Sequence, residues 1–165
     1  MFFSLQELEL RKVKFDEDLP AGEIDFGDAA LTQVGDLHTD GEAELLNNTL
    51  GEIRVRGELN VSFDLQCDRC LEPVHFPLNG TFDLFYRPAP KGPLPHEVHI
   101  DDGEAQIGFY EGGGIELSDI LREHILLSLP MHALCSEDCA GICPQCGENR
   151  NTGHCDCRTE KFDDR

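Results

Sequence analysis

Residues 53–70, IRVRGELNVSFDLQCDRC, alternate apolar and polar side chains as far as position 65, with Gly57 as the one break. A period of two places successive side chains on opposite faces, so this segment predicts a half-buried β-strand. Beyond Cys67 and Cys70 the alternation resumes on even positions, which predicts a hairpin with these two cysteines at its tip. The apolar positions are Ile53, Val55, Leu59, Val61, Phe63 and Leu65, then Val74, Phe76, Leu78, Phe82 and Leu84.

The sequence on both sides of this hairpin predicts further strands. A strand over Gly35–Leu46 is expected to pair with the 53–65 strand through a polar turn at residues 47–51. A weak alternation over residues 5–15 predicts an edge strand. Residues 88–96 hold four prolines and are therefore expected to form a surface loop. Two short strands are expected after this loop, Val98–Ile100 and Gln106–Tyr110.

One helix is predicted, over residues 117–129. Asp119 in its first turn suits the positive end of the helix dipole, and Pro130 ends it. Its apolar surface is broad, so the helix should lie across the sheet, with His124 as a packed core histidine. One face carries Leu117, Ile120, Leu121, His124, Ile125 and Ser128, and Leu126, Leu127 and Leu129 widen it.

The eight cysteines fall into four short pairs, which is typical of sulfur ligands for a structural metal. Two Cys₄ zinc sites would use every thiol, and a closed sulfur shell leaves no open position for catalysis. We expect the first site to join Cys67 and Cys70 with Cys135 and Cys139, and the second to be formed by Cys143, Cys146, Cys155 and Cys157. The competing grouping puts Cys135, Cys139, Cys143 and Cys146 together.

These features give an α+β fold: an antiparallel β-sheet or partial barrel with one packing helix, followed by a small C-terminal cysteine-rich zinc ribbon. The expected division is a β-rich domain over residues 1–133, a zinc-binding lobe over 134–157 and a disordered acidic tail over 158–165. The lobe holds few apolar side chains, so it should need metal to fold.

Composition and charge narrow the function. The 165 residues include 33 Asp and Glu against 13 Lys and Arg, a formal net charge of −20. Such a chain repels phosphate backbones, so the acids indicate either a soluble surface or a protein that holds a basic partner. The sequence contains no run of eighteen apolar residues, so no membrane-spanning segment is expected. The first residues lack the basic region of a signal peptide. A cytoplasmic protein with reduced cysteines is expected.

An enzyme is not expected. The scattered histidines and acids form no catalytic constellation, no phosphate-binding loop is present, and no small-molecule substrate is indicated. His132 and His154 lie beside cysteines and are interpreted as surface residues or neighbours of the ligands. A redox-active dithiol is the alternative use of a C-x2-C pair, but that use favours a helix N-terminus rather than a hairpin turn.

Four blocks of sequence stand out by their order and spacing: CDRCLEP at residues 67–73, LSDILREHILLSLP at 117–130, LCSEDCAGICPQCG at 134–147 and HCDC at 154–157. Together they resemble the YceD family of large ribosomal RNA subunit accumulation proteins. The resemblance implies a ribosome-biogenesis factor that supports accumulation of large-subunit ribosomal RNA. Genes of this family often neighbour one for a small basic ribosomal protein of the large subunit.

The resemblance and the negative charge are reconciled if contact with ribosomal RNA is indirect. The expected partner is then a basic large-subunit ribosomal protein or a pre-ribosomal particle. The alternative is direct RNA binding through a local basic patch of Arg54, Arg56 and Arg69. Arg11, Lys12 and Lys14 would extend this patch from a neighbouring strand.

Overall fold

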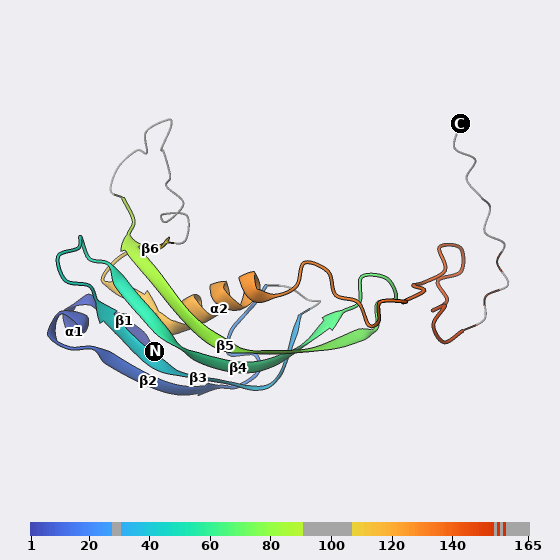
Figure 1. Ribbon diagram of the computed structural model, residues 1–165, viewed down its shortest axis with the longest axis horizontal. Coiled ribbons are helices and arrows are strands. Elements are labelled where there is room, and N and C mark those ends of the chain that lie inside the picture. The colour runs from blue at the N-terminus through green and yellow to red at the C-terminus, as the bar shows by residue number, and fades with distance from the viewer. Residues whose placement is uncertain (28–30, 91–106, 154, 156, 158–165) are drawn as a thin grey trace.

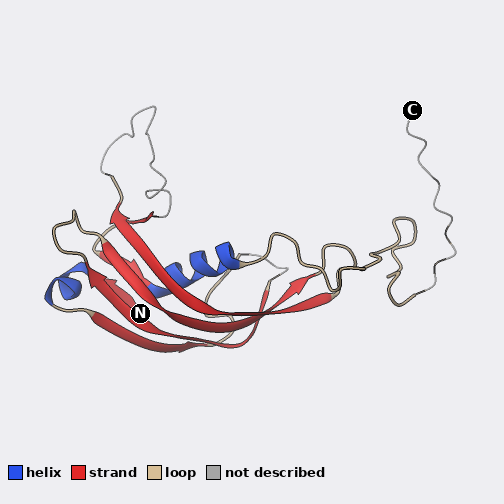
Figure 2. Cartoon of the chain, in the orientation of Figure 1, coloured by secondary structure: helices blue, strands red, loops and turns tan. Residues whose placement is uncertain are grey.

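A computed structural model describes residues 1–27, 31–90, 107–153, 155 and 157. β-Strands are the main regular structure of the described chain, and a single long helix follows the last strand (Figures 1 and 2). In chain order the elements are β1 Phe2–Ser4, α1 Leu5–Leu10, β2 Val13–Leu19, β3 Thr32–Leu45, β4 Ile53–Gln66, β5 Pro73–Pro88, β6 Ile107–Tyr110, β7 Gly114–Glu116 and α2 Leu117–Ser128.

The main sheet has the strand order β2-β3-β4-β5-β6. The predicted hairpin is confirmed: β4 and β5 pair antiparallel from Ile53↔Tyr86 to Gln66↔Pro73, and Cys67 follows directly. The strand predicted before it is also confirmed, as β3, which pairs antiparallel with β4. The alternation of apolar and polar residues explains these long pairings of β3, β4 and β5. It places every second side chain of each strand on the same face of the sheet, and this face is buried in the core.

A row of aromatic residues and glycines crosses the sheet where it curves. Phe15 lies opposite Gly41 and Phe82 lies opposite Gly57, while the two glycines face one another across β3 and β4. A Cβ on Gly57 would overlap the carbonyl oxygen of Asp40, so only glycine permits this close approach of the strands. The two rings cover the backbone that the glycines leave bare, which lets the sheet curve towards the core (Figure 1).

The sheet is not closed. In the described part of the chain, β2 and β6 are its two separate edges. The expected all-antiparallel pairing holds for β2 to β5 but fails for β6, which pairs parallel with β5 from Phe85↔Ile107 to Pro88↔Tyr110. The expected strand at Val98–Ile100 and the expected tail at 158–165 lie outside the described residues.

The edge strand expected over residues 5–15 is wrong for its first half. Residues 5–10 form helix α1, and only Val13 onward is strand. Ser4 caps this helix, since its hydroxyl accepts a hydrogen bond from the Glu7 amide at 3.2 Å. Leu8 is buried one helical turn after Leu5, a spacing that suits a helix as well as a short alternating segment.

Helix α2 lies across the concave face of the sheet, as predicted (Figure 1). Its buried side chains are packed in one core with the inward residues of the strands, including Val55 and Phe63. His124 is half-buried, with its ring 5.6 Å from that of Phe82, and burial lowers the pKa of its imidazole. Beyond α2 the chain runs to the tip of the β4–β5 hairpin, where the cysteine-rich segment lies. The helix contributes Leu117, Ile120, Leu121 and Ile125 to this core.

Candidate metal centre

The turn between β4 and β5 folds as a compact loop around its first cysteine. The Cys67 amide donates to the Glu72 carbonyl at 2.9 Å, and the Leu71 amide donates to the Cys67 carbonyl at 2.9 Å. Leu71 takes a positive φ of 64°, which is rare for a residue with a side chain. This conformation turns backbone amides towards the Cys67 sulfur: hydrogen bonds from the amides of Cys70 and Arg69 lower the pKa of the Cys67 thiol to about 6.

The same loop recurs later in the chain, at Cys143. The Cys143 amide donates to the Glu148 carbonyl at 2.8 Å, and the Gly147 amide donates to the Cys143 carbonyl at 2.8 Å. Gly147 has a φ of 75°, at the position equivalent to Leu71. Backbone amides, first that of Cys146, lower the pKa of the Cys143 thiol to about 6. Both loops therefore present a sulfur that is ready to ionise.

The segment after α2 docks onto the hairpin tip through its backbone. The Asp68 amide donates to the Ala133 carbonyl at 2.9 Å, and the Asp68 carboxylate accepts from the Ala133 amide at 3.2 Å. Further along, the Ile142 amide donates to the Arg69 carbonyl at 2.9 Å. These bonds hold residues 133–142 against the tip, and they bring Cys135 and Cys139 to the hairpin pair.

Four thiols meet at this junction: Cys67, Cys70, Cys135 and Cys139, all within 4.8 Å of one another. The Cys70 and Cys135 sulfurs are 3.5 Å apart, and those of Cys67 and Cys139 are 3.9 Å apart. A tetrahedral zinc with Zn–S bonds of about 2.3 Å requires sulfur–sulfur separations of about 3.8 Å. The spacing and chemistry of this first cluster therefore fit a tetrahedral, sulfur-bound metal ion.

A second cluster is formed by Cys143, Cys146, Cys155 and Cys157, whose sulfurs also lie within 4.8 Å of one another. The expected grouping of the eight thiols is the one that the structure brings together, and the competing set of residues 135, 139, 143 and 146 is not formed. The neighbouring Cys146 raises the pKa of the Cys157 thiol to about 12. Four thiolates at this spacing repel one another, so a cation is what would allow all of them to ionise.

Two asparagines that the sequence did not single out join the clusters. Asn151, from the loop between Cys146 and Cys155, donates to the Cys139 sulfur at 3.3 Å and accepts from the Ala140 amide at 2.8 Å. This hydrogen bond lowers the pKa of the Cys139 thiol. Asn149 donates to the Glu72 carboxylate at 3.2 Å. The loop between Cys146 and Cys155 therefore packs on the first cluster. In the sequence, its polar composition is the one signal of these hydrogen bonds.

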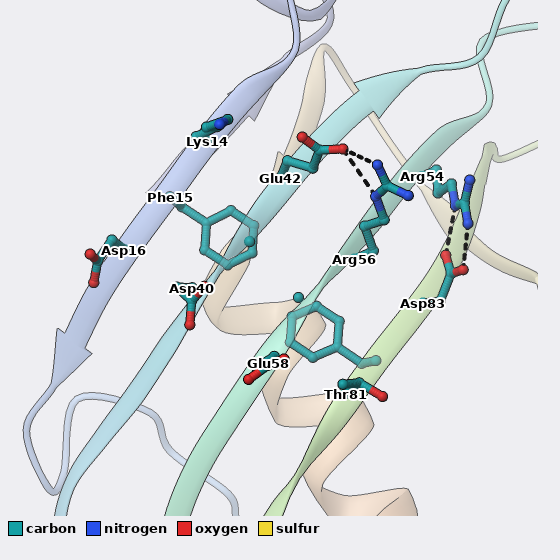
Figure 3. Close-up of a pocket in the computed structure, with 13 residues that line it drawn as sticks. Lys14, Phe15, Asp16, Asp40, Glu42, Arg54, Arg56, Glu58, Thr81 and Asp83 are labelled. Atoms are coloured by element: carbon teal, nitrogen blue, oxygen red, sulfur yellow. Dashed lines mark hydrogen bonds and ion pairs between the residues drawn. The ribbon is translucent and has the colours of Figure 1, made fainter.

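The three arginines expected to bind RNA or a partner do not form one patch. Arg69 lies at the hairpin tip, at the opposite end of β4 from Arg54, and donates to the Cys139 carbonyl at 3.1 Å. Arg54 makes two bonds to Asp83, of 2.7 and 2.6 Å, and Arg56 bonds Glu42 (Figure 3). These pairings lower the pKa of both carboxyls.

The lysines expected to extend this patch also meet acids. The Lys12 ammonium lies 2.5 Å from Glu44 and 3.8 Å from Glu42. Arg11 pairs with Glu7 at 2.5 Å on helix α1. Asp16, Asp40 and Glu58 line the same hollow of the convex face as Lys14 (Figure 3). This face is therefore a mixed, ion-paired surface rather than a positive one.

His132 lies beside the first cluster but outside its sulfur shell. Its Nδ1 atom is 3.1 Å from the Asp68 carboxylate, and the same carboxylate holds the Ala133 amide. The contact fits the expectation of a neighbour of the ligands. His154 lies outside the described residues. Across the described segments, no helix has the length and apolar character needed to cross a membrane.

A family model described as the large ribosomal RNA subunit accumulation protein YceD matches residues 55–165. The chain belongs to the YceD family. The match begins inside β4 and includes both cysteine clusters, so it covers the hairpin from Val55 onward, helix α2 and the candidate metal centre of this YceD chain. No solved structure matches the chain.

Relatives of this YceD chain occur in bacteria and plants. It is 25% identical over 150 residues to the uncharacterized protein YlbN of Bacillus subtilis, covering 89% of this chain and 80% of that protein. It is 27% identical over 131 residues to the chloroplastic YCED homolog 1 of Zea mays, a large ribosomal RNA subunit accumulation protein. That alignment covers 66% of this chain but 45% of the maize protein, so the chain spans about half of that relative's length.

Proposed function

We propose that this YceD chain is a non-enzymatic factor in ribosome biogenesis. It supports accumulation or processing of large-subunit ribosomal RNA by interacting with a basic ribosomal protein or a pre-ribosomal particle in the cytoplasm. The family match over residues 55–165 is the observation that carries the proposal. The name of the maize relative, a large ribosomal RNA subunit accumulation protein, agrees with it.

Charge favours a protein partner over direct contact with RNA. A net charge of −20 opposes phosphate binding, and Arg54 and Arg56 are already engaged by carboxylates. A negative surface would instead speed encounter with a basic ribosomal protein and keep that protein off unrelated RNA. Contact with ribosomal RNA is then indirect.

The two cysteine clusters serve this function as structural sites, one zinc ion each. The donor set of four thiols favours zinc in a reducing compartment, and a full sulfur shell leaves no position for a reacting ligand. The arrangement speaks against a redox dithiol, because each C-x2-C pair lies within a group of four sulfurs. Zinc would fold the lobe and fix it to the hairpin tip. Metal analysis of the purified protein should give two zinc ions per chain.

The test of function is a pull-down with the metal-loaded protein from extract, at low and moderate salt, with and without ribonuclease. Retention of a basic large-subunit ribosomal protein after ribonuclease treatment, weakening with salt, is the expected result. Release of all bound material by ribonuclease would overturn the protein-partner mechanism. In that case direct RNA binding, the second candidate function, becomes the better account.

A further inference from the structure

Edge strand β6 and helix α2 lie in the part of the molecule away from the cysteine-rich segment (Figure 1). Residues of both elements line a groove between them. It consists of two adjoining hollows of about 360 and 140 Å³, and both are lined by Tyr86 and Glu123. We call it the β6–α2 groove. Its other lining residues include Phe2, Phe109, Glu111, Glu116, Asp119 and Leu127.

Aromatic rings pack directly on glycine backbone in this groove, because a glycine has no side chain to exclude them. A Cβ on Gly108 would overlap the ring of Tyr86, and a Cβ on Gly114 would lie 2.8 Å from the ring of Phe2. The Tyr86 hydroxyl donates to the Glu123 carboxylate at 3.5 Å, which ties the strand to the helix. The rings are therefore held in place by the fold, and the floor is preformed.

The groove combines exposed apolar groups with negative charge. Phe109 is 63% exposed and Leu127 is 80% exposed, both unusual for large apolar residues that line one concave surface. Among the described residues that line the groove there are four carboxylates and no Lys or Arg. Glu116 lies 3.8 Å from the N-terminal amine, while Glu111 and Asp119 face solvent.

We propose that the β6–α2 groove binds a Lys- and Arg-bearing polypeptide segment that inserts one large apolar side chain against the Tyr86 and Phe109 surface. Four carboxylates around an apolar floor complement such a segment in both charge and polarity. They repel the phosphates of RNA, and they equally repel a second copy of a chain with a net charge of −20. The proposal rests on the proposed function, since it gives the basic protein partner its docking site.

The test uses the full metal-loaded chain and short fluorescent peptides of Arg and Gly with one central Phe. Matched peptides replace the Phe with Ala or each Arg with Glu. In an anisotropy titration at physiological salt, the Arg–Phe peptide should bind about ten-fold more tightly than the Arg–Ala peptide, and the Glu peptide should not bind. Amide shifts on binding should concentrate at residues 107–111 and 116–127. Shifts spread over the convex face instead would overturn the proposal.

One double variant and one matched double control separate the effect of the groove from that of overall charge. Glu111→Lys with Asp119→Lys should weaken the Arg–Phe peptide about ten-fold. The same charge change on the convex face, Asp16→Lys with Glu58→Lys, should cost about two-fold. Equal losses in the two double variants would refute the groove.

A second comparison tests the apolar floor. Phe109→Ala should abolish the preference for the Phe peptide over the Ala peptide, whereas Leu10→Ala, at a position 87% exposed on α1, should preserve it. Both positions are exposed, so folding is expected to survive each change. If wild-type and groove variants capture the ribosomal protein equally well, the groove assignment fails while the proposed function stands. If the wild type captures none, the proposed function itself fails.

Discussion

Replacing Cys67 and Cys70 together by Ser should remove one of two bound metal ions and release the lobe from the hairpin tip. The remaining links between tip and lobe are hydrogen bonds such as Asp68 to Ala133, each worth about 1 kcal/mol. Ordering residues 133–142 costs about 1–2 kcal/mol per residue. A bound structural zinc offsets that cost with on the order of 10 kcal/mol, so the segment should detach without it.

The β-domain should survive the same change. Its hydrophobic core contains no cysteine, and the three buried cysteines of the first site form a separate small cluster with Val74 and Leu134. The far-UV circular dichroism spectrum and the midpoint of urea unfolding should therefore stay close to those of the wild type. Glu-C cleavage after Glu137, which lies between Cys135 and Cys139 of the first cluster, should become fast.

The assay is metal content per chain by mass spectrometry, combined with this proteolysis. The matched control replaces Cys143 and Cys146 by Ser: it also loses one ion, but leaves the bond after Glu137 protected because the first cluster is intact. Loss of both ions, or of neither, from the Cys67 and Cys70 variant would refute the grouping of thiols. Unfolding of the whole chain would refute the separation of core and lobe.

Four further outcomes follow from the contacts. Gly57→Ala should destabilise the fold by about 2 kcal/mol in urea unfolding, because its Cβ meets backbone, while Gly80→Ala, with nothing within 4 Å, should be nearly neutral; equal effects would contradict the glycine row. Asn151→Ala should make one of the two expected ions about ten-fold easier to extract in a chelator competition, since the hydrogen bond to the Cys139 sulfur is lost; unchanged extraction of both ions would argue against the link between the clusters. Excess chelator should remove both ions and disorder the lobe, while the amide NMR signals of the β-domain persist. A single cooperative loss of all amide signals would contradict this prediction. Arg54→Glu with Arg56→Glu should leave affinity for ribosomal RNA unchanged in a gel shift, because both guanidinium groups are already paired; a ten-fold loss would restore the basic patch as an RNA site.

Local patterns in the chain were sufficient for the central hairpin, the long helix and the cysteine pairs. The alternation over residues 53–65 defines β4 because a strand places every second side chain in the core. The helix over Leu117–Ser128 follows from apolar spacing and from Pro130, which ends it. The eight cysteines indicated metal because their short spacings suit sulfur ligation, whatever the surrounding fold.

Tertiary structure decided which distant groups meet. Cys70 and Cys135 are 65 positions apart, and they approach only because backbone bonds dock the segment after α2 on the hairpin. The parallel pairing of β6 with β5 likewise depends on a long connection between the two strands. The alternation of apolar and polar residues in a strand does not indicate whether it pairs parallel or antiparallel with its neighbour. Ion pairing of Arg54 required Asp83 from the adjacent strand, so positive charges that lie close together along the chain became part of a mixed, ion-paired surface in the fold. The β6–α2 groove has the same origin: its acids and rings come from β1, β5, β6, β7 and α2 and from the turn after β6, and only their packing makes one site.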